Sequence, residues 1–276
     1  MGNHALDLNP PDAVFHITTH ASDWLFSMFS FNTLVLLLVI GLTLTRPRGT
    51  RLFHNLAVII LTTTSIAYFS MASDLGAAGI DTEFRETGAP ATRQIWYVRY
   101  IQWFITFPLL LLSLLLTTGL SVSDILTTLF MSEVVVICGL VGSLVHSTYK
   151  WAYFTFGTVA LFYVWYSLLV NGPRTSSPGG GAFRTGYWLS AGYVSFMLLT
   201  YPICWACSEG SNLITPTDEM IWYGILDLIT GPVFLSFFLF QLRAVDYESF
   251  GFASGKYSDA VAAPVRPTKA QEAGAV

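Results

Sequence analysis

The chain has 276 residues, of which 53% are hydrophobic, 15% aromatic and only 11% charged, and its formal net charge is −4. Soluble globular domains carry about 25% charged residues, so this composition excludes an ordinary soluble protein and indicates a membrane protein. The negative net charge and the lack of a basic patch in the sequence also lead us to expect no nucleic-acid partner.

Seven apolar segments are long enough to cross a lipid bilayer, which takes about 20 mostly apolar residues in a helix. In chain order they cover residues 22–45, 53–73, 95–118, 122–145, 148–170, 186–207 and 219–242. The sequence therefore predicts an all-α membrane protein, a seven-transmembrane-helix bundle. We divide the chain into an N-terminal tail (1–21), a membrane domain (22–243) and a C-terminal tail (244–276). The C-terminal tail is rich in small and polar residues and is expected to be disordered.

Polar and turn-forming residues separate the apolar segments. The longest break, "DLGAAGIDTEFRETGAPATRQ" at 74–94, is expected to form a loop. The break "NGPRTSSPGGGAFRTG" at 171–186 has the glycine, proline and serine content of a linker. The break between the fourth and fifth segments is the weakest, because only "HSTYK" at 146–150 marks it.

Lysine and arginine residues in the loops predict the orientation, because cytoplasmic loops carry an excess of both. On the side of the N-terminus the sequence places Arg85, Arg93 and Lys150. The opposite side carries Arg46, Arg48, Arg51, Arg174, Arg184, Arg243, Lys256, Arg266 and Lys269. Nine basic residues against three predict an extracellular N-terminus and a cytoplasmic C-terminus.

Two ionisable residues lie well inside the predicted spans, Arg99 in the third and Asp227 in the seventh; Glu133 lies in the fourth span. A charge at the centre of a bilayer costs about 2.5–3.5 kcal/mol on insertion scales, so such residues normally face the bundle interior and have a partner. Arg99 and Asp227 therefore either pair and hold the third and seventh spans together or belong to a proton or ion path. These residues alone leave the two interpretations open.

The sequence offers no catalytic apparatus. Cys138, Cys204 and Cys207 all lie inside apolar segments, so we expect neither a disulfide framework nor a redox pair from the CxxC spacing. No nucleophile–base pair, metal-ligand cluster or phosphate-binding loop is recognisable. We therefore expect no enzyme activity and no metal.

Several motifs follow one another in the spans. The third reads "VRYIQWFITFPLLLLSLLL", the fourth ends "GLVGSLV", the fifth opens "YKWAYFTFG", the sixth contains "LLTYPICWACSEG" and the seventh "ILDL". The pattern R-Y-x-x-W-x-x-T-x-P, followed in order by TYPxxW and ILDL, resembles the microbial rhodopsins, and fungal members most closely. This resemblance covers nearly the whole membrane region and implies a bundle of the microbial rhodopsin type.

The resemblance also identifies a missing group. Microbial rhodopsins carry a lysine four residues after the aspartate of the seventh helix, and retinal is bound to it as a Schiff base. Here that position is Gly231. The three lysines of the chain are Lys150, at a helix end, and Lys256 and Lys269, in the tail. We therefore expect no cofactor, and in particular no covalently bound retinal.

Two further positions depart from the proton pumps. The resemblance places the proton-acceptor carboxylate at Gln102 and the donor carboxylate at Ser113, and neither side chain can take that role near neutral pH. Because the lysine and one carboxylate are both absent, the positive Arg99 and the negative Asp227 remain balanced. We infer a retained buried polar cluster, formed by Arg99, Gln102, Tyr201 and Asp227.

The resemblance also implies a vestigial pocket, formed by Trp103, Thr106, Phe107, Phe154, Leu198, Tyr201 and Trp205. We expect Phe107 and Phe154 to fill the space of the absent lysine and polyene, with lipid as the alternative. The Gly231–Pro232 pair predicts a kink in the seventh helix, because proline removes a backbone donor. Glu209 and Glu219 match an outer acidic pair of the pumps, but we expect both at the ends of an exposed loop.

Retinal-free relatives are known as the fungal opsin-related proteins, which include the 30 kDa plasma-membrane heat-shock protein group, and the sequence is similar to them. The resemblance implies a stress-response protein of the plasma membrane, either a chaperone-like factor or a modulator of the plasma-membrane proton ATPase. A non-covalent lipid- or retinoid-binding receptor or sensor, a passive proton or ion conductor and a scaffold remain alternatives. The expected partners are the lipid bilayer and other membrane proteins, and the sequence leaves homo-oligomers open.

Overall fold

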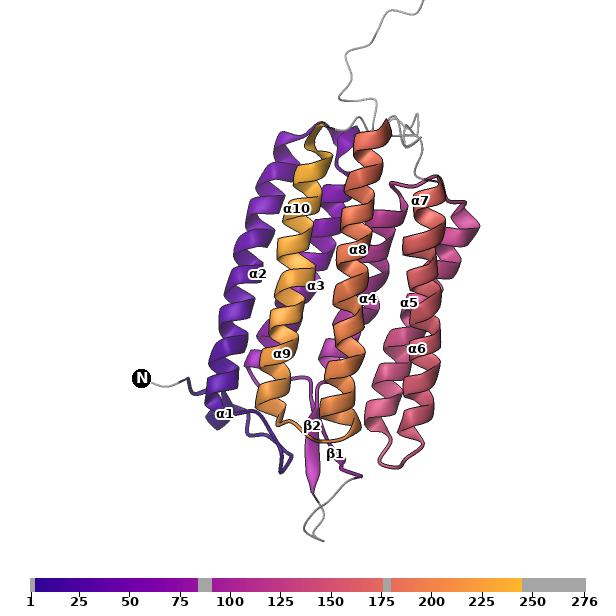
Figure 1. Ribbon diagram of the computed structural model, residues 1–276. Coiled ribbons are helices and arrows are strands. Elements are labelled where there is room, and N and C mark those ends of the chain that lie inside the picture. The colour runs from indigo at the N-terminus through magenta and orange to yellow at the C-terminus, as the bar shows by residue number, and fades with distance from the viewer. Residues whose placement is uncertain (1–2, 84–90, 176–179, 245–276) are drawn as a thin grey trace, which may run out of the picture.

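The computed structural model describes residues 3–83, 91–175 and 180–244 of the chain, without the side chains of 180–184. The predicted tail at 244–276 therefore lies outside the described residues except for residue 244. The described residues form a bundle of helices with a small β-hairpin at one end (Figure 1). We call the end with the hairpin the hairpin end and the opposite end, where residue 244 lies, the tail end.

In the part of the chain that the structure describes, seven helices are long and apolar enough to cross a membrane, which confirms the predicted fold class. The first five are α2 (Thr19–Thr45), α3 (Leu52–Ala72), α4 (Tyr97–Leu115), α5 (Val122–Leu144) and α6 (Lys150–Tyr166), the last continued by a π-helical segment (Ser167–Asn171) and α7 (Gly172–Thr175). The sixth is α8 (Gly180–Trp205) with a π-helical segment (Ala206–Gly210), and the seventh is α9 (Pro216–Leu228), a π-helical segment (Ile229–Val233) and α10 (Phe234–Gln241). A one-turn helix α1 (Ala5–Leu8) and short 3-10 turns (Arg48–Thr50, Leu242–Ala244) complete the helical elements among the described residues.

Hydroxyl side chains start three of these helices. Thr18, Ser121 and Thr215 precede α2, α5 and α9 and each accepts a hydrogen bond from a backbone N–H of the first turn. Such side chains satisfy donors that the helix itself leaves free. In α9, Pro216 follows the cap and takes the position where a missing N–H costs nothing.

The prediction of a linker at 171–186 is wrong for most of the residues described in this range, because they are helical. The fifth span continues in helical form to Thr175, and α8 already begins at Gly180. Tyr187 of α8 donates a hydrogen bond to the Leu168 carbonyl at 3.0 Å. Packing between the two helices therefore extends them through glycine and proline residues whose intrinsic preference is against helix.

The predicted loop at 74–94 contains a β-hairpin that the sequence did not indicate. Strands β1 (Ala78–Asp81) and β2 (Thr92–Ile95) pair antiparallel, with Ala78 opposite Ile95. Phe15 of the N-terminal segment adds a parallel bridge to Arg93. The hairpin thus covers the end of the bundle, and its second strand leads directly into α4.

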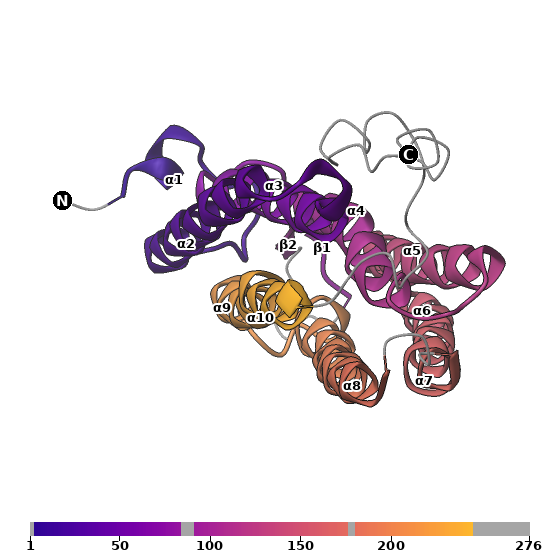
Figure 2. The same cartoon turned by 90° about the horizontal axis from the view of Figure 1, so that it is seen from above.

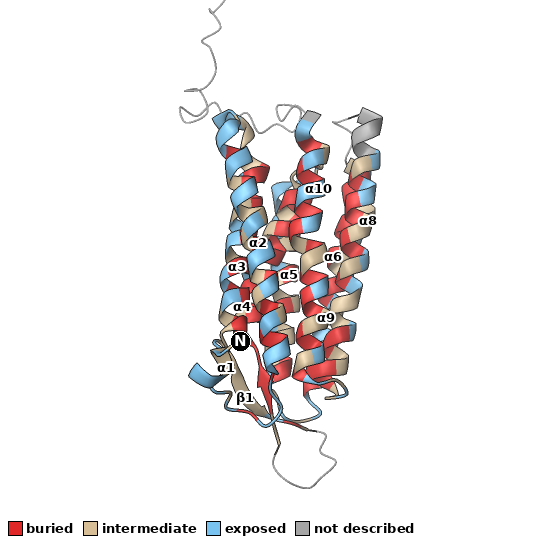
Figure 3. Cartoon of the chain, turned by 90° about the vertical axis from the view of Figure 1, so that its left-hand side faces the viewer, coloured by how far each residue is buried: buried red, intermediate tan, exposed pale blue. Residues whose placement is uncertain are grey.

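Seen from above, the helices form two rows (Figure 2). One row runs α2, α3, α4, α5; the chain turns at α6 and returns through α8 to α9 and α10. The most apolar stretch of α4 is 61% buried and that of α2 only 22%, so α4 lies at the centre and α2 at the edge. Figure 3 shows the same contrast, with buried residues on the inner faces and exposed ones outside. The exposed residues of α2 include Leu34, Leu37, Leu38 and Leu42, as expected for a multi-pass membrane protein whose outer face contacts lipid.

Candidate functional site

Arg99 of α4 and Asp227 of α9 face each other across the bundle. Their nearest atoms, Arg99 Nη2 and an Asp227 carboxylate oxygen, are 3.8 Å apart, and both side chains are buried. The distance is that of an ion pair and is too long for a hydrogen bond. The acid of the seventh span is therefore compensated by a base from the third span.

Two tyrosines donate the hydrogen bonds that Asp227 accepts. The hydroxyl groups of Tyr68 on α3 and Tyr201 on α8 lie 2.7 and 2.8 Å from its two oxygens. Tyr201 belonged to the predicted cluster, whereas Tyr68 was missed, because no motif of the sequence connects it to residue 227. The ring of Tyr223 lies under the Arg99 guanidinium, 3.3 Å from ring centroid to Cζ, and provides a cation–π contact.

Gln102, the remaining residue of the predicted cluster, is buried on α4. Its amide nitrogen lies 3.5 Å from the Thr64 hydroxyl of α3, at the limit of hydrogen bonding, and its oxygen accepts no hydrogen bond from the described residues. Gln102 and Asp227 nevertheless line the same small cavity, together with Thr106 and Gly231. This cavity leaves about 20 Å³ for the centres of water-sized molecules, and one water needs about 10–15 Å³ on this measure.

Gly231 lies at an irregular turn of the seventh span. It is part of the π-helical segment Ile229–Val233, which contains Pro232. Such turns are a recognised cause of helix bending, and the irregularity lies where the Gly–Pro pair predicted a kink. Tyr193 of α8 donates a hydrogen bond to the Ile229 carbonyl at 2.9 Å and so helps to satisfy the backbone there. Apart from its chain neighbours and the backbone of its own helix, a Cβ atom added at Gly231 would meet no atom of the described residues within 4 Å.

A larger cavity lies between α4, α5, α6, α8 and α9. It leaves about 110 Å³ for the centres of water-sized molecules, and six of the seven predicted pocket residues line it: Trp103, Phe107, Phe154, Leu198, Tyr201 and Trp205. Thr106 lines the small cavity instead. Our expectation that Phe107 and Phe154 fill this space is wrong. Phe107 packs edge-on against Trp103, and Phe154 stacks on Trp205 at 5.5 Å, so both rings form walls.

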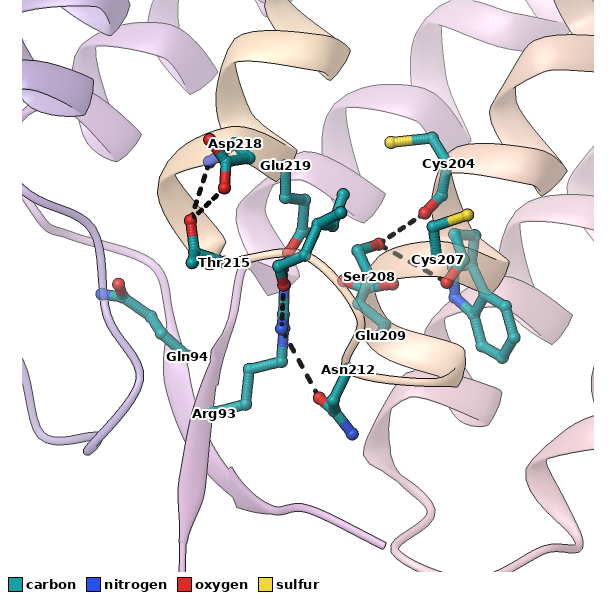
Figure 4. Close-up of polar contacts among 12 residues, drawn as sticks. Arg93, Gln94, Cys204, Cys207, Ser208, Glu209, Asn212, Thr215, Asp218 and Glu219 are labelled. Atoms are coloured by element: carbon teal, nitrogen blue, oxygen red, sulfur yellow. Dashed lines mark hydrogen bonds and ion pairs between the residues drawn. The ribbon is translucent and has the colours of Figure 1, made fainter. Parts of the chain in front are cut away.

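A second ion pair closes the hairpin end. Arg93 of β2 points to Glu219 in the first turn of α9, with 2.5 Å between nitrogen and oxygen, and both side chains are buried (Figure 4). Arg93 also donates a hydrogen bond to the Ile214 carbonyl at 2.8 Å and lies 3.5 Å from the Asn212 side chain. The prediction that Glu219 lies at the end of an exposed loop is wrong, because the hairpin and the turn before α9 cover it.

Glu209 is buried as well, and its exposed position was also wrongly predicted. Its carboxylate accepts a hydrogen bond from the Tyr100 hydroxyl, and its backbone carbonyl accepts one from the Lys150 amino group at 3.3 Å. Lys150 lies 3.8 Å from the Glu83 carboxylate. Glu209 and Glu219 therefore have separate partners, Tyr100 and Arg93, and Lys150 is held at the hairpin end.

The hairpin also binds the N-terminal segment. The Gln94 side chain accepts a hydrogen bond from the Ile17 backbone at 3.1 Å and donates one to the Asp74 carboxylate at 2.5 Å. Burial raises the pKa of the Asp74 carboxyl, and the Gln94 amide offsets part of this effect. Strand β2 therefore connects three parts of the molecule. Gln94 binds the N-terminal segment, Arg93 binds α9, and the strand itself leads into α4.

Metal chemistry has no support in the described residues, since no three His, Cys, Asp or Glu side chains are placed to hold an ion together. Cys138, Cys204 and Cys207 are free thiols.

Comparison with known proteins identifies the family. The family model described as "Bacteriorhodopsin-like protein" matches residues 18–245. Protein FDD123 of Trametes versicolor is 64% identical over 276 residues, which covers 100% of this chain and 96% of that protein. The 30 kDa heat shock protein of Saccharomyces cerevisiae is 36% identical over 269 residues, with 86% of this chain and 77% of that protein covered.

A solved structure gives the same result. The light-driven proton pump Rhodopsin CsR of Coccomyxa subellipsoidea has a TM-score of 0.78 and 30% sequence identity, and 82% of this chain and 98% of that one are covered. The family match thus includes all seven spans and both residues of the central ion pair. The chain belongs to the bacteriorhodopsin-like protein family and is a fungal opsin-related protein.

Proposed function

We propose that this chain is a retinal-free opsin-related protein that acts in the stress response at the plasma membrane. It works either as a chaperone-like factor or as a modulator of the plasma-membrane proton ATPase, and it is not a light-driven pump. The observation that carries the proposal is Gly231, which has no side chain at the position where the family binds its chromophore. The similarity to the 30 kDa heat shock protein supports the stress-response part, and the loop charges support an extracellular N-terminus.

Retinal is held in this family as an imine of a lysine, and the residues present do not fit that bond. Lys150 lies at the hairpin end with its amino group 3.3 Å from the Glu209 carbonyl. Lys256 and Lys269 lie outside the described residues, in the segment after the seventh span. Among the described residues, no lysine that could supply the amine for imine formation lines the two cavities beside Arg99 and Asp227.

The proton path of a pump is also interrupted. Gln102 is neutral and cannot take up a proton near neutral pH. Towards the tail end, the Ser113 hydroxyl donates to the Leu110 carbonyl in its own helix at 2.6 Å, and a serine hydroxyl is not an acid of useful strength. The Arg99–Asp227 pair then acts as a structural connection between α4 and α9.

Adding all-trans-retinal to the purified protein tests the proposal. We expect no visible absorption band that survives denaturation, because that band requires a covalent bond. Gly231→Lys is expected to gain such a band, since a side chain at this position has free space beside Asp227. Gly231→Met is the matched control, because it adds a chain of similar length without an amine. A denaturation-resistant band in the unmodified protein would overturn the proposal.

The ATPase part needs a separate experiment. Affinity purification of the tagged full chain from heat-stressed cells, followed by mass spectrometry, is expected to recover the proton ATPase above its level with a tagged membrane protein of matched abundance. Recovery at the control level would contradict the modulator role.

A further inference from the structure

We infer that the outer face of α5 and α6 binds a transmembrane helix of another membrane protein, one that carries a lysine or arginine at the centre of the bilayer and places it beside Glu133. This names the kind of partner that the proposed function requires and in that respect rests on that function. Three properties of the Glu133 side chain carry the inference: its depth in the membrane, its outward direction and its lack of a partner within the chain.

Glu133 lies at the centre of its span. The helix α5 runs from Val122 to Leu144, so eleven of its residues precede Glu133 and eleven follow it. At a rise of about 1.5 Å per residue, the Cα atom of Glu133 is about 16 Å from either end of the helix, and the hydrocarbon core of a bilayer is about 30 Å thick. The side chain is therefore too short to bring its carboxylate to the bilayer surface.

The Glu133 side chain lies on the outer side of α5. It is partly exposed, and the residues about one turn before and after it, Phe130 and Ile137, are 59% and 47% exposed. Ser132 and Val136, on the inner side of the same helix, are buried. Glu133 also lines neither of the two central cavities. The carboxylate therefore faces the surroundings of the bundle, between two apolar side chains.

The neighbouring helix α6 completes this outer face. Thr128 of α5 donates a hydrogen bond to the hydroxyl of Ser167 of α6 at 2.9 Å. The two helices are antiparallel, so five residues further along α5 and five residues back along α6, Glu133 and Phe162 lie at the same level. Phe162 and Val159 are 56% and 61% exposed. We call the following residues the α5–α6 outer face: Leu126, Phe130, Glu133, Ile137, Val159 and Phe162.

Glu133 has no partner within the described part of the chain. Its carboxylate forms no hydrogen bond and no ion pair with any residue that the structure describes. The other members of the α5–α6 outer face are all apolar. Because an acid at the centre of a bilayer is unfavourable unless a partner compensates it, the missing partner comes from another molecule.

A basic residue on a transmembrane helix of a different protein fits this position. Every lysine and arginine that the structure describes lies outside the spans or among the first or last three residues of one. A second copy in the same orientation therefore presents none of these at the depth of Glu133. Lipid amines belong to the head groups, about 15 Å from the bilayer centre. A transmembrane helix, in contrast, holds a basic side chain at a fixed depth, and its charge complements the carboxylate.

Synthetic transmembrane peptides test the partner. Three leucine-rich peptides differ only in the central residue, which is lysine, leucine or glutamate, and each carries an acceptor dye. The full chain, fused at its C-terminus to a fluorescent donor, is reconstituted with each peptide in phosphatidylcholine vesicles, and energy transfer at increasing peptide-to-lipid ratio gives the affinity. We expect the lysine peptide to bind about 3- to 30-fold tighter than the leucine peptide, the range that polar contacts between membrane helices supply.

Variants test the place of binding. Glu133→Gln is expected to abolish the preference for the lysine peptide, because the amide keeps the shape of the side chain but carries no charge. Asp124→Asn is the matched control: it removes a carboxylate from the exposed first turn of the same helix and is expected to leave the preference unchanged. The charge-swapped Glu133→Lys is expected to bind the glutamate peptide tighter than the lysine peptide, which a misfolded variant would not do.

Equal binding of the lysine and leucine peptides to the unmodified chain would overturn the inference, and so would an unchanged preference in Glu133→Gln. Energy transfer between two differently labelled copies of the chain that Glu133→Gln abolishes would assign the face to a second copy and would overturn it as well. The vesicles contain neither retinal nor a proton ATPase. Failure of the peptide experiment therefore leaves the proposed function in place, whereas a covalently bound retinal would contradict that function alone, so the two failures are distinguishable.

Discussion

Asp227→Asn is expected to lower the free energy of unfolding by about 3–5 kcal/mol, because it leaves the charge of Arg99 buried without compensation. Asp227 is the carboxylate paired with Arg99, and both side chains are buried. The asparagine has nearly the same shape and keeps one oxygen that accepts a hydrogen bond from Tyr68 or Tyr201. The loss therefore reports the missing charge. Unfolding in mixed micelles by SDS, followed by circular dichroism, measures it.

A double variant separates the charge from the rest of the site. Arg99→Met/Asp227→Asn removes both charges, and we expect it to recover most of the stability that Asp227→Asn loses. The effects of substitutions at two residues in contact on the free energy of unfolding are not additive. Asp23→Asn on the exposed face of α2 is the matched control and is expected to change stability by less than about 0.5 kcal/mol. Equal stability of the single and the double variant would contradict the assignment of Asp227 as the compensating charge.

Arg93→Met is expected to be similarly destabilising, by about 3–5 kcal/mol, because it leaves the buried Glu219 carboxylate without its partner. The ion pair is short, 2.5 Å, and both side chains are at most 4% exposed, so solvent screens it little. Arg93 also satisfies the Ile214 carbonyl. Thermal unfolding at neutral pH measures the loss, and hydrogen exchange locates it: amides of β2 and of the first turn of α9 are expected to exchange faster.

The control for this variant is Arg48→Met, which replaces an exposed arginine of the turn before α3 and is expected to leave the melting temperature nearly unchanged. Arg93→Met/Glu219→Gln removes both charges and is expected to be more stable than Arg93→Met alone. If Arg93→Met and Arg48→Met had the same melting temperature, the Arg93–Glu219 ion pair would contribute no stability, and the hairpin would not stabilise the bundle through it.

The two ion pairs differ in how well the sequence predicted them. Arg99 and Asp227 both lie inside long apolar segments, and a charge in lipid requires a partner from another helix, so their pairing could be inferred. Arg93 and Glu219 lie beside polar breaks, where charged residues are ordinary. Nothing in their neighbourhood indicated that a hairpin would bury them, and Glu209 and Glu219 were therefore wrongly placed at an exposed surface.

The sequence alone determined the seven spans, the position of the central charges and the absence of a lysine at residue 231, because each depends on contiguous apolar residues or on the identity of a single residue. The tertiary structure decided the hydrogen bonds of Tyr68, the ion pair of Arg93 and the open central cavity. These depend on residues that are far apart in the chain: residues 68 and 227 are 159 positions apart, and residues 93 and 219 are 126 apart. Hydropathy is a local sum and carries no information on such distances. Whether aromatic side chains fill a space or line it depends on rotamers that only the packed bundle selects.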